Sequence, residues 1–129
     1  MSKYVPYHAP SAAYAKQLTA GIRSPLEKYT AITSYVSRMI RYDYIRAIKI
    51  PKKGGLPDVQ HVWQTHMGIC LDTAALTVGM LRAAGLQSYL CIGHADRQYH
   101  AWVETTIDGK TYRYDHDGKA TTYRTERKY

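Results

Sequence analysis

The sequence predicts an α+β fold, with helices from the part of the chain before Gly85 packed on an antiparallel β-sheet formed by the part after it. Apolar residues recur at three- and four-residue intervals before Gly85, and beyond it the period changes to two. The Asp-Gly dipeptide at 108–109 separates two alternating stretches and is typical of a two-residue hairpin turn. Helices first and neighbouring strands afterwards indicate an α+β fold rather than alternating β-α-β units.

The size and composition of the chain fit one globular domain. Its 129 residues suit a single domain, since domains typically hold about 100–150 residues. With 45% hydrophobic residues the chain can bury an ordinary core, which excludes wholesale disorder. We therefore expect one domain over residues 1–129. No signal peptide or membrane span is expected, so the chain should be soluble. Its compartment stays open, because the chain can be a domain excised from an exported bacterial protein.

Helix signals mark several segments before Gly85. A first helix is expected over residues 11–20. The Ser-Pro-Leu-Glu sequence at 24–27 supplies an N-cap, a proline at the first helical position and a capping-box acid, so a second helix is expected from 25 to about 41. A short helix should follow over 59–64, and a buried one over 70–84.

Turn and strand signals define the remaining segments. The Pro- and Gly-rich sequence at 51–57 predicts an exposed loop inside the domain. Alternating residues beyond Gly85 predict four strands. These strands are expected over residues 87–93, 99–107, 110–114 and 120–124.

Cys70 lies at the start of the predicted helix over 70–84. A thiol at a helix N-terminus lies near unpaired N–H groups and the positive end of the helix dipole, which favours the nucleophilic thiolate. Most cysteines are small buried hydrophobes, and Cys91, in an apolar strand, is expected to be one of them. A catalytic role for Cys70 requires a base within hydrogen-bond reach.

His100 is the candidate base. If the Asp-Gly dipeptide at 108–109 forms a two-residue turn, His100 faces Asp117 directly and Asp115 diagonally, on the same face of the hairpin. A carboxylate at either position can fix the orientation of the imidazole, as a base in nucleophilic catalysis requires. We therefore expect a thiol, an imidazole and a carboxylate from separate segments to meet in one cleft.

Five short motifs carry a family resemblance. They are Arg-Tyr-Asp at 41–43, Gly-Ile-Cys-Leu-Asp at 68–72, Met-Leu-Arg-Ala-Ala-Gly-Leu at 80–86, His-Ala-Trp-Val-Glu at 100–104 and Tyr-Asp at 114–115. Their order and spacing resemble those of the transglutaminase-like superfamily, in the form of a small bacterial domain. The resemblance implies a papain-like core over about residues 41–118.

The resemblance also implies roles for single residues. Cys70 would be the nucleophile, His100 the general base and acid, and Asp115 the orienting residue. The fifteen-residue step from His100 to Asp115 suits the family, and Asp117 is the alternative orienting acid. One departure is His116, because a proline usually follows the aspartate in this family.

An acyl-transfer site further needs hydrogen-bond donors for the oxyanion of its tetrahedral intermediate. The backbone N–H of Cys70 is the first expected donor. Gln64 is a candidate second donor because it begins a sequence that resembles the Q-x-x-x-G-x-C of papain-like proteases. Trp63 is its rival, since eukaryotic transglutaminases use an indole N–H. Trp102 and Tyr99 are expected to line the groove wall or the core.

The implied function is that of a thiol-dependent amide or peptide hydrolase or acyltransferase, which forms a thioester with a protein or peptide substrate and uses no cofactor. We favour hydrolysis because a small domain leaves little material for a large acceptor site. The alternatives are a protein-cross-linking transglutaminase and a non-catalytic binding module on the same fold.

The charge of the chain supplies one more alternative, a nucleic-acid binder. The formal net charge is +8, and basic residues interleave with tyrosines between residues 38 and 53. We favour a solvated basic face instead, which could also attract an anionic surface polymer. No metal site is expected, because the histidines are scattered and no HExxH or CxxC pair occurs.

Overall fold

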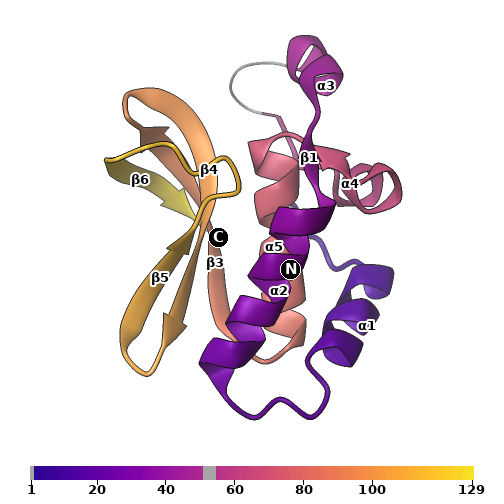
Figure 1. Cartoon of the computed structure of the whole chain (residues 1–129). Coiled ribbons are helices and arrows are strands. Elements are labelled where there is room, and N and C mark those ends of the chain that lie inside the picture. The colour runs from indigo at the N-terminus through magenta and orange to yellow at the C-terminus, as the bar shows by residue number, and fades with distance from the viewer. Residues whose placement is uncertain (1, 51–54) are drawn as a thin grey trace.

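The computed structural model describes residues 2–50 and 55–129 and has two layers (Figure 1). Helices form one layer, and a four-stranded antiparallel sheet forms the other. The predicted α+β class is therefore confirmed. Of the loop expected at 51–57, residues 55–57 have neither helix nor strand structure, and the rest lies outside the described residues.

Side-chain caps begin the helices Pro25–Met39 (α2) and Val59–Thr65 (α4) where the sequence predicted them. At the start of α2, Ser24 accepts a hydrogen bond from the N–H of Glu27 at 3.3 Å. At the start of α4, Asp58 accepts one from the N–H of His61 at 3.0 Å. The helices of the described chain are α1 Ala9–Leu18, α2 Pro25–Met39, α3 Tyr44–Lys49, α4 Val59–Thr65 and α5 Cys70–Ala83.

Two features of the helical layer differ from the prediction. Helix α1 begins two residues earlier than expected, because His8 caps it and accepts a hydrogen bond from the N–H of Ser11 at 3.3 Å. Helix α3 has no counterpart among the predicted helices. Its six residues are too few for a periodic pattern, and it depends on Asp43, which accepts a hydrogen bond from the N–H of Arg46 at 2.9 Å.

The sheet has the strand order β5-β4-β3-β6. Its strands are β3 Gln87–Ala95, β4 Gln98–Ile107, β5 Lys110–Tyr114 and β6 Tyr123–Lys128. Ile107 pairs with Lys110 and Val103 pairs with Tyr114, so the register expected from a two-residue turn is confirmed. Positive φ angles of 51° at Asp108 and 78° at Gly109 are those of the tight turn that this dipeptide favours.

The last strand was expected at 120–124, and this prediction is wrong, because β6 begins only at Tyr123. The carboxylate of Asp96 accepts hydrogen bonds from the N–H groups of Thr121 at 2.9 Å and Thr122 at 2.8 Å. These bonds hold the preceding residues in a turn. Strand β6 then pairs with β3 across a bulge at Gly93, where an added Cβ would overlap the carbonyl oxygen of Arg124.

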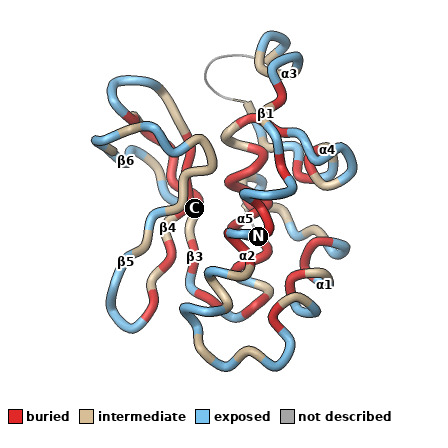
Figure 2. The backbone as a smooth tube through the Cα atoms, viewed as in Figure 1, coloured by how far each residue is buried: buried red, intermediate tan, exposed pale blue. Residues whose placement is uncertain are grey.

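Helix α5 occupies the centre of the hydrophobic core. It packs against strands β3 and β4 on one side and against helices α1, α2 and α4 on the other. Its side chains Leu76, Val78 and Leu81 are fully buried. Figure 2 shows the buried segments of α5 and of the sheet facing one another. The first residue of this buried helix is Cys70, so the core fixes the position of the thiol.

A short parallel pair of strands lies beside the beginning of α5. Strand β1 (Arg41–Tyr42) pairs with β2 (Met67–Gly68), and Tyr42 is opposite Gly68. This pairing brings the segment after α2 next to the residues that lead into Cys70. No helix in the described part of the chain is long and apolar enough to cross a membrane.

Candidate active site

Close packing at Gly68 sets the approach of the chain to Cys70. A Cβ at Gly68 would lie 2.9 Å from Cγ2 of Val62 and 3.0 Å from Oγ1 of Thr73. Any larger side chain would therefore separate β2 from α4 and α5. The glycine of the G-x-C sequence is explained by this contact, since it lets the backbone turn into the helix directly before the thiol.

Asp72 fixes the same turn from inside the protein. Its carboxylate is fully buried and accepts hydrogen bonds from the N–H of Ile69 at 3.2 Å and from that of Asp58 at 2.8 Å. Arg46 binds both of its oxygens, at 2.7 and 3.1 Å. Removing one partner of a buried ion pair typically costs about 3–5 kcal/mol. Asp72 thus ties α3 and α4 to the first turn of α5.

His100 and Asp115 form a hydrogen-bonded pair. Nε2 of His100 lies 3.0 Å from each carboxylate oxygen of Asp115. The hydroxyl of Tyr123 donates to Oδ2 of Asp115 at 2.8 Å, and the N–H of Asp117 donates to Oδ1 at 3.2 Å. Burial alone would raise the pKa of Asp115, but the hydrogen bond with His100 and its charge outweigh burial and lower it. Asp115 is therefore an ionised partner of the ring.

The thiol of Cys70 also acts on this ring. Burial lowers the pKa of His100, but the hydrogen bonds to Asp115 and Cys70 outweigh it and raise the pKa from 6.5 to about 10. The ring is therefore protonated at neutral pH. An imidazolium beside a thiol at a helix N-terminus favours an ion pair between the imidazolium and the thiolate.

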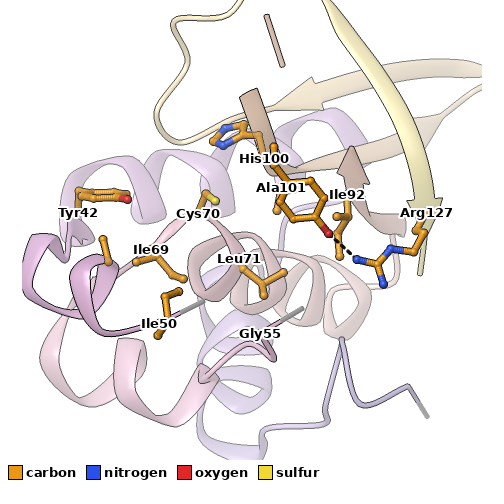
Figure 3. A pocket seen from close by; sticks show the side chains of 12 residues that line it. Tyr42, Ile50, Gly55, Ile69, Cys70, Leu71, Ile92, His100, Ala101 and Arg127 are labelled. Carbon is orange, nitrogen blue, oxygen red and sulfur yellow. Dashed lines mark hydrogen bonds between the residues drawn. The ribbon is translucent and has the colours of Figure 1, made fainter. Parts of the chain in front are cut away.

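Two hollows meet at Cys70 and His100. The first is an apolar cavity of about 180 Å³ between α5 and the sheet (Figure 3). The second is a more polar groove of about 660 Å³, which Asp115 and Asp117 also line. A carbonyl group bound across the junction of these two hollows can contact both the thiol of Cys70 and the imidazole of His100.

Tyr42 lines both hollows and is a residue to which the sequence analysis assigned no catalytic role. Its pairing with Gly68 places it beside the residues that lead into Cys70. Burial, followed by the nearby charges of Cys70 and Asp117, raises the pKa of Tyr42, so its hydroxyl keeps its proton and can donate. Figure 3 shows this hydroxyl on the side of the ring that faces Cys70. The Arg-Tyr-Asp motif at 41–43 was the available signal.

Neither predicted side-chain donor for the oxyanion lies at this site. Gln64 is on the exposed face of α4, and it lines neither hollow. The ring of Trp63 packs instead against Tyr14, with the ring centres 5.8 Å apart, and against His8 at 6.0 Å. Both side chains lie on α4, which ends at Thr65, and neither lines a hollow beside the thiol.

The two predicted groove residues have different positions. Tyr99 lines both hollows, as expected of a groove residue. Trp102 lies in the core, with 1% of its surface exposed, and its ring stacks on that of His100 with the centres 6.3 Å apart. Trp102 therefore supports the imidazole from behind and does not form a wall of either hollow.

His116, which departs from the family pattern, has a structural role. Its Nε2 donates a hydrogen bond to the carbonyl oxygen of Ile40 at 2.8 Å. This bond ties the turn that carries Asp115 to the end of α2, directly before the strand that carries Tyr42. A hydrogen bond from the histidine thus holds the turn where the family usually has a proline.

Asp115 and Asp117 also belong to the only group of possible metal ligands found among the described residues. One atom of each of these carboxylates and one ring nitrogen of His100 lie within 4.8 Å of one another. Nε2 of His100 is already bonded to both oxygens of Asp115, so a metal ion would have to replace those hydrogen bonds. The hydrogen bonds account for the placement of these side chains.

Comparison with known proteins identifies the class. A family model described as the transglutaminase-like superfamily matches residues 12–116. The chain therefore belongs to the transglutaminase-like superfamily, as the resemblance of its motifs predicted. No match was found among curated proteins.

Solved structures share this fold. A candidate cysteine protease from Cytophaga hutchinsonii has a TM-score of 0.72 and 20% identity, over 92% of this chain and 40% of that one. A candidate protease from Parabacteroides distasonis has a TM-score of 0.68 and 25% identity, over 86% and 24%. The periplasmic domain of TgpA from Pseudomonas aeruginosa has a TM-score of 0.63 and 19% identity, over 89% and 45%. The chain thus spans less than half the length of each of these proteins.

Proposed function

We propose that this protein is a thiol-dependent hydrolase of amide bonds in peptides or proteins. Cys70 is the nucleophile, His100 the general base and acid, and Asp115 the orienting acid. The observation that carries the proposal is the position of His100, which is hydrogen-bonded to Asp115 at 3.0 Å and lines the same two hollows as Cys70. Structural likeness to two candidate proteases supports the same class of reaction.

The reaction has two steps. In the first, the thiolate of Cys70 attacks an amide carbonyl, and the imidazolium of His100 gives its proton to the leaving amine, which departs as the C–N bond breaks. The product is a thioester between the acyl group and Cys70. In the second, the neutral imidazole takes a proton from a water molecule that attacks the thioester, and the acid leaves with the thiol restored as thiolate.

Each step passes through a tetrahedral intermediate whose oxyanion needs donors. The backbone N–H of Cys70, at the start of α5, is the first donor that we propose. The hydroxyl of Tyr42 is the second. It replaces the expected side chains of Gln64 and Trp63, because Tyr42 lines both hollows beside the thiol and remains protonated.

Hydrolysis rather than transfer to an amine is the outcome that we propose for the thioester. The groove of about 660 Å³ beside His100 is lined by polar side chains such as Asp96, Gln98 and Lys119, so water can reach the thioester from that side. Transfer to an amine is the alternative outcome. The likeness to a periplasmic domain supports a place for this chain within an exported protein.

Alkylation by iodoacetamide tests the nucleophile without a known substrate. At neutral pH, Cys70 should react at least about 100-fold faster than Cys91, as measured by mass spectrometry of the two cysteine-containing peptides. The variant His100→Ala should slow the alkylation of Cys70 and leave that of the buried Cys91 unchanged. The matched control is Cys91→Ala, in which Cys70 should keep the wild-type rate. Equal rates for the two cysteines in the wild type would contradict the proposal.

The ester p-nitrophenyl acetate tests the acyl-enzyme. The wild type should release nitrophenol in a burst and carry an acetyl group on Cys70, followed by steady turnover to acetate. A primary amine such as glycine amide added to the reaction distinguishes the two fates of the thioester, because transfer would give the acetylated amine. A protein whose Cys70 is alkylated but never acetylated would be a binding module and would overturn the proposal.

A further inference from the structure

Arg127 of strand β6 reaches the apolar cavity that contains Cys70. It lines this cavity together with Tyr99, on the side away from Tyr42 (Figure 3). Its guanidinium is held by tyrosine hydroxyls. One terminal nitrogen donates to Tyr99 at 2.6 Å, and the other donates to Tyr4 at 3.3 Å and to Tyr129 at 3.2 Å.

No acidic side chain neutralises this guanidinium within the described part of the chain. The neighbouring arginine on the same strand, Arg124, lies 3.7 Å from Glu126, and Lys128 lies 3.0 Å from Glu104. Arg127 has only the tyrosines. A guanidinium has five N–H groups, and three of those of Arg127 are used by the tyrosines. The remaining two N–H groups and the full positive charge are available to a ligand.

The tyrosines fix the guanidinium rather than neutralise it. Hydrogen bonds with Tyr4 and Tyr99 raise the pKa of Arg127 above its ordinary value, so the charge is permanent. The rings of Tyr4 and Tyr129 stack with their centres 4.3 Å apart, and the guanidinium lies 5.4 and 5.9 Å from these two centres. A pre-organised guanidinium is the group that proteins favour for recognition of carboxylates.

The rest of the cavity lining is mostly apolar. It includes the side chains Ala47, Ile50, Ile69, Leu71, Ile92 and Ala101. The cavity volume of about 180 Å³ is well below the roughly 300–1,000 Å³ of sites that hold drug-sized ligands, so one amino-acid side chain suits it. A side chain with an apolar stem and a charged end matches a cavity with apolar walls and a cation at its end.

The two hollows accommodate different parts of the substrate. Cys70 and His100 line both hollows, so a substrate bound across them has one side in each. The polar groove suits the leaving amine, to which His100 gives its proton in the proposed reaction. The acyl part then lies over Cys70 on the apolar side. We propose that Arg127 binds a carboxylate on the side chain of the substrate residue that supplies the reacting carbonyl, so that the protein selects acidic acyl donors such as glutamate. This inference rests on the proposed function of Cys70.

Peptide chloromethyl ketones test this specificity, because they alkylate the thiol and need no turnover. Three probes differ only in the residue that carries the ketone, which is Glu, Gln or Leu. The second-order rate of Cys70 alkylation by the Glu probe should exceed those of the other two by roughly 10- to 100-fold, the range expected for a hydrogen-bonded ion pair. All rates are divided by the iodoacetamide rate of the same protein.

Variants of Arg127 locate the source of the preference. Arg127→Gln should bring the Glu and Gln probes within about twofold of each other, and Arg127→Lys should keep part of the preference. The matched control is Arg124→Gln, an exposed arginine of the same strand paired with Glu126, which should keep the full preference. Circular dichroism and thermal melting verify that each variant is folded.

The outcomes separate this inference from the proposed function. Fast iodoacetamide labelling of Cys70 with equal rates for the three ketones would overturn the role of Arg127 and leave the nucleophile intact. Slow labelling of Cys70 by iodoacetamide would overturn both. A Glu preference that survives in Arg127→Gln would show that another cation binds the carboxylate and would also overturn the assignment.

Discussion

The two cysteines of this protein lie in the same small fold and have opposite surroundings. Cys91 lies in the middle of β3, fully buried between Trp102 on one neighbouring strand and Lys128 on the other. Burial, followed by the charge of Glu104, raises the pKa of Cys91 to about 12. Cys70 is only half-buried, begins α5 and lies beside the protonated ring of His100. One thiol is kept neutral inside the sheet, and the other lies at a helix start beside a protonated imidazole.

The contrast between the two cysteines indicates that reactive side chains in this fold lie at the ends of helices and strands rather than in their interiors. A strand interior satisfies its own N–H groups in the ladder, so it offers nothing to an anion. A helix N-terminus has unpaired N–H groups, and the turn after β5 is free to carry a carboxylate toward a ring on β4. Three changes test how much of the contrast each group supplies.

The largest effect is expected from the orienting acid. Asp115→Asn keeps the shape of the side chain but removes the charge that holds the imidazolium, so hydrolysis of p-nitrophenyl acetate should fall about 100-fold. The matched variant Asp117→Asn should change the rate by less than about fivefold. A larger loss in Asp117→Asn than in Asp115→Asn would reassign the orienting role to Asp117.

A smaller effect is expected from the proposed oxyanion donor. Tyr42→Phe removes one hydroxyl at the rim of the cavity, so acetylation of Cys70 by p-nitrophenyl acetate should slow by roughly 10- to 30-fold. Alkylation by iodoacetamide forms no oxyanion and should change by less than about threefold. If both reactions slow equally, Tyr42 acts on the thiolate itself and the oxyanion assignment is wrong.

The smallest effect is expected from pH. The pKa of His100 is raised from 6.5 to about 10, so its stabilising charge is fully present below about pH 6.5 and is lost as the pH rises through about 10. Between about pH 6 and 8, the iodoacetamide rate of Cys70 should therefore change by less than about threefold. In His100→Gln the rate should instead rise steeply with pH, as it does for an ordinary thiol near its pKa. A steep rise in the wild type would contradict the ion pair.

Much of the candidate site was predictable because its parts are local. The hairpin register follows from one dipeptide, and it places Asp115 and Asp117 on the face of His100. The position of Cys70 at a helix start follows from the change in pattern after Gly68. In both cases a few adjacent residues decide the backbone conformation, so no distant contact is needed.

The features that the sequence analysis missed or misplaced depend on contacts between segments far apart in the chain. Tyr42 comes to the thiol only because β1 pairs with β2, which joins segments 25 or more residues apart along the chain. Gln64 and Trp63 are near Cys70 in sequence, yet Gln64 is exposed on α4 and Trp63 packs against Tyr14. The start of the last strand was misplaced because the carboxylate of Asp96 binds the N–H groups of Thr121 and Thr122 just before β6.

The sequence by itself determined the order of helices and strands, the tight hairpin, and the three residue types placed to form a nucleophile, a base and an orienting acid. These features follow from periodicity, caps and turn residues, whose energetics are local. Only the tertiary structure decided which side chains surround the thiol. Tyr42 and Arg127 come from segments far apart in the sequence, and both line the cavity of Cys70 because the helices and the sheet pack together around α5.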